Sequence, residues 1–195
     1  MTGEIVNIYQ LTGSGPTYNE ATAIRFASAD VFNSGLAYPC KVPPNGISTY
    51  YSYWITLCLG YSGDYSLINN ARFWGPGNIK ASWFGTSYGR MIVGRMDTGD
   101  HGFAVASYQQ AGGTPGTTGA GLKAAAPNGH AQYRDRTATV LDVDTLSEAS
   151  PLVFDSRSIT SDGYSKAFCI QTEAYAGASH GEFSPIELVL AVDCV

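Results

Sequence analysis

A period-two alternation of side chains between residues 48 and 59 constrains the fold of this chain more than any other feature. Within the stretch STYYSYWITLCL, every second side chain is aromatic or aliphatic. These positions are Tyr51, Tyr53, Ile55, Leu57 and Leu59. Successive side chains of a β-strand point to opposite faces of its sheet, so the pattern predicts a strand with one fully apolar face.

Two further runs follow this strand, each after a group of turn residues. The turn residues occupy 60–64 and 75–78, and alternation returns at 65–68 and again at 79–84. Glycine, proline, asparagine and aspartate favour turns because they accept backbone angles that other residues resist. The region therefore predicts three consecutive strands arranged as a meander.

Short strand-like runs recur along the rest of the chain. They lie at 5–11, 91–93, 103–108, 137–143, 151–154, 167–175 and 186–195, and residues 21–27 fit either a strand or a short helical turn. No amphipathic helix is evident. Many short strands separated by Gly/Pro turns predict an all-β fold, an antiparallel β-sandwich or jelly roll, with residues 1–195 forming a single domain.

The charge of the chain argues against several classes of partner. Charged residues make up 14% of the sequence and the net charge is −5, whereas about 25% charged residues is usual. Nucleic-acid binding needs a basic surface that displaces counterions, and anionic membranes attract basic segments. We therefore expect neither a nucleic-acid partner nor a membrane partner.

The N-terminus and the cysteines bear on the compartment. The first residues, MTGEIVNIYQ, have no basic segment and no apolar core, and no apolar run is as long as a membrane-spanning helix requires. We therefore expect synthesis in the cytoplasm without a secretory signal. The four cysteines, Cys40, Cys58, Cys169 and Cys194, are widely spaced. Cys58, Cys169 and Cys194 lie in strand-like runs, where small buried apolar residues are the favoured interpretation and zinc binding is the alternative.

Residues 109–130 differ from the rest of the sequence. This tract, QQAGGTPGTTGAGLKAAAPNGH, has no periodicity, and Leu122 is its one large aliphatic residue. A tract with so little apolar surface gains little by packing on its own domain. The sequence thus predicts a long loop or an extended flexible arm, and as an arm it would contact neighbouring subunits. Its interface candidates are Gly112, Thr114, Thr117 and Leu122.

Three groups of residues resemble catalytic or metal-binding patterns. Residues 85–89, GTSYG, match a nucleophile elbow around Ser87, but the sequence after them predicts a strand where that motif needs a helix. Residues 97–101, DTGDH, could supply metal ligands, although they lack the spacing of an EF-hand. Asp142 and Asp144 could act as paired carboxylates. In each case an ordinary turn or a solvated strand face is the simpler interpretation, so we expect no catalytic residue, metal or cofactor.

Aromatic residues are concentrated between residues 50 and 88, in greater number than one core requires. The surplus predicts an exposed aromatic surface suited to a protein interface, with Trp74, Trp83 and Tyr88 as candidates. The alternative is a carbohydrate-binding β-sandwich in which Trp54, Trp74 or Trp83 stacks on sugar rings.

Several segments resemble those of a known group of proteins. The strand 69–74, NNARFW, follows a Tyr/Trp-rich strand, and the segment 168–171, FCIQ, is followed by 176–178, AGA, and a final apolar strand. In these features the chain resembles small β-rich accessory virion proteins of tailed viruses, the tailed bacteriophages. The resemblance implies a non-enzymatic structural protein of the virion, either a capsid decoration (cement) subunit or a neck or tail component. It also implies a homo-oligomer whose partners are other virion subunits, such as a major capsid protein.

Overall fold

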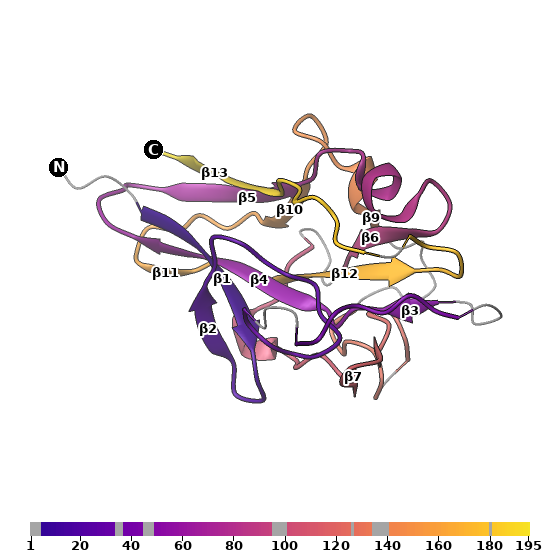
Figure 1. The fold of residues 1–195 in the computed structure, drawn as a ribbon. Coiled ribbons are helices and arrows are strands. Elements are labelled where there is room, and N and C mark those ends of the chain that lie inside the picture. Colours follow the sequence, from indigo (N-terminus) through magenta and orange to yellow (C-terminus); the bar gives the residue numbers. More distant parts are fainter. Residues whose placement is uncertain are drawn as a thin grey trace.

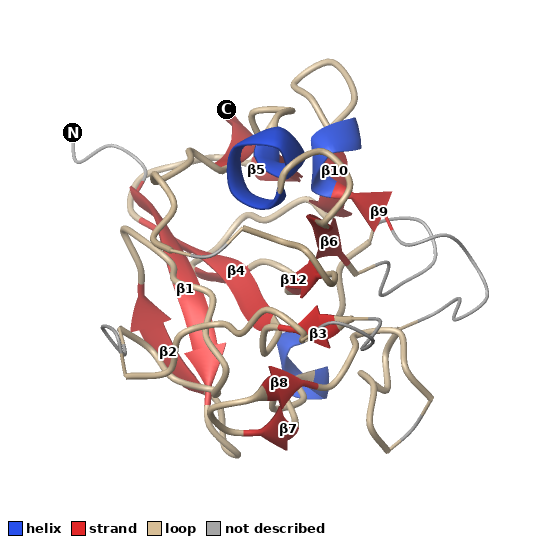
Figure 2. Ribbon diagram, turned by 45° about the vertical axis from the view of Figure 1, so that its right-hand side comes forward, coloured by secondary structure: helices blue, strands red, loops and turns tan. Residues whose placement is uncertain are grey.

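The computed structural model describes residues 5–33, 37–44, 49–94, 101–125, 127–133, 141–179 and 181–195. Strands dominate these ranges, and helix is confined to short turns (Figure 2). The strands are β1 Ile5–Thr12, β2 Thr17–Glu20, β3 Tyr50–Tyr51, β4 Ile55–Ser62, β5 Ile68–Trp74, β6 Gly89–Val93, β7 Gly113–Thr114, β8 Thr118–Gly119, β9 Leu141–Asp142, β10 Leu152–Asp155, β11 Gly163–Tyr164, β12 Phe168–Ala174 and β13 Val189–Cys194.

Two antiparallel sheets pack face to face, which confirms the prediction of an all-β sandwich. In the described residues the large sheet has the order β2-β1-β4-β12-β6-β9, with β11 beside β4 and β3 beside β12. The small sheet has the order β10-β5-β13. Figure 1 shows β5 and β13 above β1, β4 and β12, with β7 on the opposite side of the large sheet.

The large sheet is buried on both faces, and the alternation of its strands determines which side chain faces which way. In β4, Ile55, Leu57 and Leu59 enter the core between the two sheets, whereas Cys58 enters a second core on the other face. Strand β12 divides in the same way, with Phe168 and Ile170 in the first core and Cys169 in the second. The predicted apolar face is therefore confirmed for Ile55, Leu57 and Leu59 only. Residues 52–54 interrupt the predicted strand between β3 and β4, and Tyr53 packs in the second core instead of the first.

The prediction of a meander is wrong for its second strand and for its third. Strand β5 does not pair with β4; it is the central strand of the small sheet, between β10 and β13. The chain thus crosses from one sheet to the other, which places Phe73 of β5 against Phe168 of β12, with their ring centroids 4.9 Å apart. Alternation shows that one face of a strand is apolar, and that face is buried whether the strand extends the same sheet or belongs to a second sheet packed on it. The pattern therefore does not distinguish the two arrangements.

The third predicted strand, at 79–84, is a π-helical turn, Lys80–Phe84. The carboxylate of Asp144 accepts hydrogen bonds from the backbone N–H groups of Ile79 and Lys80, each at 2.8 Å. Asp142 pairs with the Lys80 ammonium at 2.6 Å and accepts a hydrogen bond from the Asp144 N–H. These two aspartates therefore position a helical turn, and their hydrogen bonds replace those of a strand ladder.

The segment 101–133 covers the second face of the large sheet. Phe103, Ala111, Leu122 and Tyr133 pack there against Cys58, Ile92 and Cys169 of the sheet, and Trp54 joins the same cluster. Within this segment, Phe103 forms one bridge to Ala167, and Val105–Ser107 is a 3-10 turn in place of the strand predicted at 103–108.

The described part of the tract 109–130 is a loop packed on its own domain, so of the two predicted alternatives the structure has the loop and not the extended arm. Leu122 is fully buried. The side chain of Gln171 donates to the carbonyl oxygens of Ser52 and Ala120, at 2.7 and 2.8 Å, and accepts from the Leu122 N–H at 2.9 Å. One buried glutamine thus satisfies three backbone groups and offsets part of the cost of ordering a tract with few apolar residues.

Other predicted elements have mixed outcomes. Residues 5–11, 91–93, 151–154, 167–175 and 186–195 correspond to β1, β6, β10, β12 and β13. Residues 21–27 form neither a strand nor a helix and contribute a single bridge at Ala27. Of the run 137–143, the structure describes only 141–143, and residues 97–100 lie outside the described ranges.

A buried carboxylate at the end of β10 makes stability depend on pH. Asp155 is 1% exposed and accepts hydrogen bonds from the Arg157 guanidinium at 2.7 and 2.8 Å and from the Lys166 N–H at 2.7 Å. Burial alone would raise the pKa of Asp155, but the bonds from Arg157 and Lys166 outweigh it and lower this pKa. The charged form therefore stabilises the folded protein at neutral pH, and this contribution is lost as the pH falls through the lowered pKa.

We expect Asp155→Asn to reduce the free energy of unfolding at pH 7 by roughly 1.5–3 kcal/mol, the range for hydrogen bonds to a charged group. Because the wild-type carboxyl is protonated in acid, the difference between the two proteins should shrink below its pKa. Denaturant titrations at pH 7 and pH 3 measure both values. An equal difference at the two pH values would contradict this role for Asp155.

Candidate functional site

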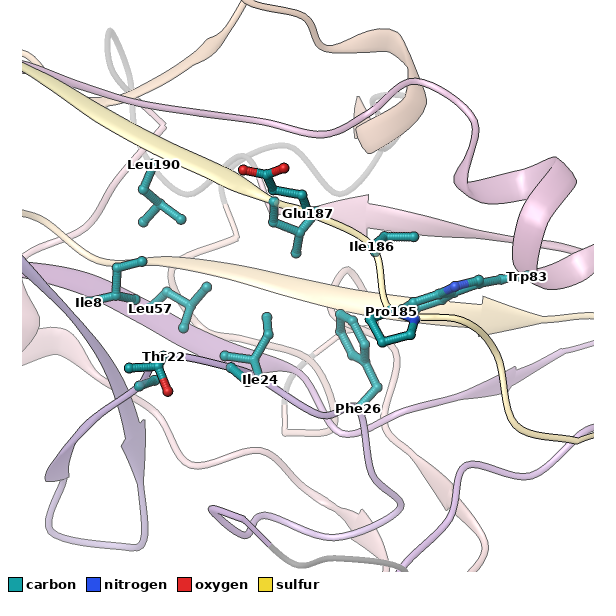
Figure 3. A pocket seen from close by; sticks show the side chains of 13 residues that line it. Ile8, Thr22, Ile24, Phe26, Leu57, Trp83, Pro185, Ile186, Glu187 and Leu190 are labelled. Atoms are coloured by element: carbon teal, nitrogen blue, oxygen red, sulfur yellow. The ribbon is translucent and has the colours of Figure 1, made fainter.

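An apolar groove lies on the open side of the sandwich. It runs between the small-sheet strand β13 and the segment 21–26, and its floor is formed by Ile8 of β1 and Leu57 of β4 (Figure 3). Its volume is about 580 Å³. The lining residues are Ile8, Ala21, Thr22, Ala23, Ile24, Phe26, Leu57, Trp83, Pro185, Ile186, Glu187, Leu188 and Leu190.

Strand β13 forms one wall of the groove and is an edge strand. It pairs with β5 on one side, and no described strand pairs with its other side. Leu190 lies opposite the buried Phe73 and faces the core, whereas Val189 lies opposite Trp74 on the outer face. Leu190 points toward the groove in Figure 3. An edge strand has a free row of backbone donors and acceptors, and here that row adjoins exposed apolar surface.

The other wall, residues 21–26, is fixed by backbone hydrogen bonds at its two ends. The Ala21 N–H donates to the Ile8 carbonyl at 2.8 Å, and the Ala27 carbonyl accepts from the Tyr53 N–H at 2.9 Å. Between these anchors, the backbone of 22–26 makes no hydrogen bond to any described residue. The segment places Ile24 and Phe26 over the core without continuing the sheet.

An aromatic cluster closes one end of the groove. Trp83 projects from the π-helical turn, donates its indole N–H to the Ser184 carbonyl at 3.0 Å, and stacks on Phe183 with centroids 6.0 Å apart. Phe26 contacts the same indole edge-on at 6.2 Å. Phe183 is 38% exposed, so the exposed apolar surface extends past the end of the groove onto this cluster. Phe183 and Phe84 also line a second, smaller pocket of about 250 Å³.

The structure brings only one of the predicted interface residues into this groove. Trp83 lines it, and Trp74, half-buried in the neighbouring strand β5, packs against the core between the sheets. Tyr88 is 47% exposed, and its ring lies over Gly177, away from the groove lining. The remaining candidates belong to the tract 109–130, where Gly112, Thr114 and Thr117 are at least partly exposed on or beside the β7–β8 hairpin. Leu122 is buried, so it is not an interface residue in this chain.

Most groove residues were not identified as site residues from the sequence. Ile8, Leu57 and Leu190 lie in strands whose apolar pattern indicated only core. One feature of the sequence could have indicated the groove. Apolar side chains occupy almost every position of residues 186–192, and the strand to which they belong, β13, lies at a sheet edge. Such runs are typical of strands covered on both faces.

The described residues offer little reactive chemistry. Ser87 is exposed in a turn, and strand β6 rather than a helix follows it. Cys58 and Cys169 are fully buried, and burial raises the pKa of each thiol to about 12; Cys40 and Cys194 are exposed, which corrects the prediction that Cys194 is buried. In the ranges that the structure describes, no group of three His, Cys, Asp or Glu residues is placed to hold a metal ion. Nor does any described helix have the length and apolarity needed to cross a bilayer.

We expect the purified protein to show no esterase turnover that depends on Ser87. A strand after the serine leaves no helix N-terminus to orient the hydroxyl and to stabilise an oxyanion. Assays with activated esters should give equal background rates for the wild type and Ser87→Ala. Turnover that disappears in the variant would contradict the interpretation of residues 85–89 as an ordinary turn.

No family model, no curated protein and no solved structure matches this chain.

Proposed function

We propose that this chain is a non-enzymatic structural subunit of a virion, most simply a capsid decoration (cement) protein. Its role is to stabilise the particle through contacts with other subunits. The observation that carries the proposal is the apolar groove beside the free edge of β13, because apolar surface of this kind is costly to leave exposed in a free monomer.

The chemistry of the groove favours a protein partner over a small polar ligand. Glu187 and Thr22 supply the only polar side chains among the lining residues that the structure describes. Small-molecule sites combine apolar walls with several convergent polar groups, which fix the orientation of the ligand. The cores of protein interfaces, in contrast, are aromatic and poor in charge, as this surface is around Trp83 and Phe183.

The assignment to a virion is supported by the resemblance of segments 69–74, 168–171 and 176–178 to accessory virion proteins. The net charge of −5 is consistent with a subunit that contacts protein rather than packaged nucleic acid. The proposed partners are a major capsid protein or other virion subunits and further copies of this chain. The alternative within this proposal is a structural role in the neck or tail of the virion.

Rebinding to virions tests the proposal directly. Particles that lack this protein are incubated with the wild type, with Ile186→Ser in the groove, or with Ile5→Ser, and binding is measured by co-sedimentation. Ile5 is 50% exposed and is not among the lining residues, so it controls for the loss of an isoleucine elsewhere. We expect the wild type and Ile5→Ser to bind in fixed stoichiometry and Ile186→Ser to bind at least several-fold more weakly. Absence of the native protein from purified virions would contradict the proposal.

A second candidate function, carbohydrate binding, rests on a different surface from the one predicted. Trp54 is 3% exposed and cannot stack on a sugar. A tyrosine cluster on the large sheet is better placed: Tyr164, 43% exposed, lies 4.5 Å from Tyr18 and 5.5 Å from Tyr9 between ring centroids. Partly exposed aromatic rings of this kind bind sugar faces. Glycan-array binding that is lost in Tyr164→Ala would favour this function over assembly.

A further inference from the structure

We infer that the groove receives an extended strand from a different protein chain, which pairs with the free edge of β13 and carries a basic residue opposite Glu187. This inference rests on the proposed function as an assembly subunit and specifies the partner of the same groove. The partner segment is defined by three properties: a backbone free to pair, apolar side chains at alternate positions, and one positive charge.

The backbone around the groove is suited to strand addition. Residues 185–188 lead into β13 without regular secondary structure, and their backbone groups make no hydrogen bond to any described residue. The same is true of residues 22–26 on the opposite wall. A peptide laid between the two walls can pair with the edge of β13, and main-chain hydrogen bonds of this type supply much of the affinity in strand addition.

The side chains beneath this edge determine the pattern of the incoming strand. Leu188 and Leu190 both line the groove, and Leu190 lies above Ile8 and Leu57 (Figure 3). In an added strand, side chains alternate between this apolar space and the outer face. Every second residue of the partner is therefore apolar and buried in the groove, and the residues between them are exposed.

Charge selects the partner among strands with this pattern. Glu187 is the one charged residue among the described groove residues, and its carboxylate points away from the groove, toward the outer face (Figure 3). A basic residue opposite it in the added strand forms a favourable cross-strand pair.

A second copy of β13 is disfavoured as the occupant. A two-fold antiparallel pairing centred on Leu190, which pairs residues 185–195 of the two copies along their whole length, sets Glu187 opposite Asp193. Like charges directly opposite each other destabilise a strand pair. The occupant therefore comes from a different chain.

Synthetic peptides test the inference on the intact protein. The probe is a capped nine-residue peptide of alternating threonine and valine with lysine at its centre, on the threonine face. Two comparison peptides carry glutamate in place of lysine or proline in place of two valines, and binding is measured by isothermal titration. We expect the lysine peptide to bind the wild type up to about fivefold more tightly than the glutamate peptide, the range for one cross-strand charge pair. We expect no binding of the proline peptide, which cannot pair along its backbone.

Variants of the protein make the result specific to the groove. In Glu187→Lys the preference between the lysine and glutamate peptides should reverse, a result that non-specific adhesion to apolar surface does not produce. Ile24→Asn, in the groove, should weaken binding, whereas Arg25→Asn, outside the lining, should bind as the wild type does.

Equal binding of all three peptides, or a preference unchanged by Glu187→Lys, overturns the strand-addition inference. Failure of every peptide while Ile186→Ser still loses rebinding to virions also overturns it, and leaves the proposed function in place. If instead the peptides bind as expected but the native protein is absent from virions, strand addition holds and the virion role fails.

Discussion

Replacement of Gln171 by leucine should lower the free energy of unfolding by roughly 3–6 kcal/mol, although leucine is close to glutamine in size. The Gln171 side chain is fully buried and bonds to the backbones of Ser52, Ala120 and Leu122. The substitution leaves the buried Ser52 carbonyl and Leu122 N–H, and the partly buried Ala120 carbonyl, without this partner. Each loss at a buried group costs about 1–3 kcal/mol, and the partly exposed carbonyl costs less. Chemical denaturation measures the change.

The same variant should also loosen the loop that covers the second face of the large sheet. Limited proteolysis is expected to cut within residues 109–125 of Gln171→Leu under conditions that leave the wild type intact. Gln109→Leu is the matched control: the side chain of Gln109 bonds to the Gly129 carbonyl at 3.2 Å and to the Ala131 N–H at 2.7 Å at the edge of the same loop. Because Gln109 is partly exposed, its loss should cost no more than about 1.5 kcal/mol. Equal costs for the two variants would show that Gln171 does not anchor the loop.

Phe168→Ala should have an effect of similar size on the core between the sheets, roughly 3–5 kcal/mol, the range for removing a buried aromatic side chain. Phe168 is fully buried in β12 and contacts Phe73 and Phe154 of the small sheet, with centroids 4.9 and 4.6 Å apart. Removing the ring leaves a cavity where the two sheets meet. The midpoint of denaturant unfolding should fall accordingly.

The control for this prediction is the same substitution at Phe183, a ring that is 38% exposed and stacks on Trp83. We expect Phe183→Ala to cost about 1 kcal/mol or less, since exposed rings lose little hydrophobic free energy. If Phe168→Ala were no more destabilising than Phe183→Ala, the packing of the two sheets through these aromatic residues would be wrong.

The alternation of residues 55–59 and of residues 168–174 shows how far the sequence determines this fold. In both runs one set of side chains enters the core between the sheets, as predicted. Period-two alternation follows from the geometry of the strand itself, so it can be read without knowing which strands are neighbours. The all-β class and most strand positions were therefore predictable from local pattern.

Two elements near the predicted meander show where local pattern is insufficient. Residues 79–84 alternate as a strand would, but Asp144, distant in sequence, accepts hydrogen bonds from the backbone of Ile79 and Lys80 and a π-helical turn forms. Strand β5 was predicted correctly as a strand, yet it belongs to the other sheet. The π-helical turn depends on Asp144, which is 64 residues from Lys80 in the sequence. The position of β5 depends on β10 and β13, its neighbours in the small sheet.

The local pattern of the sequence determined the all-β class, while the tertiary structure decided which apolar residues are covered. The tract 109–130 has little apolar surface to bury, but the hydrogen bonds of Gln171 and the packing of Leu122 in the second core hold its described part on the domain. Conversely, residues 186–192 read as a covered strand, but β13 lies at a sheet edge and leaves a groove open. Whether an apolar residue is buried depends on its neighbours in space, and these are set by long-range pairing that a local pattern does not contain.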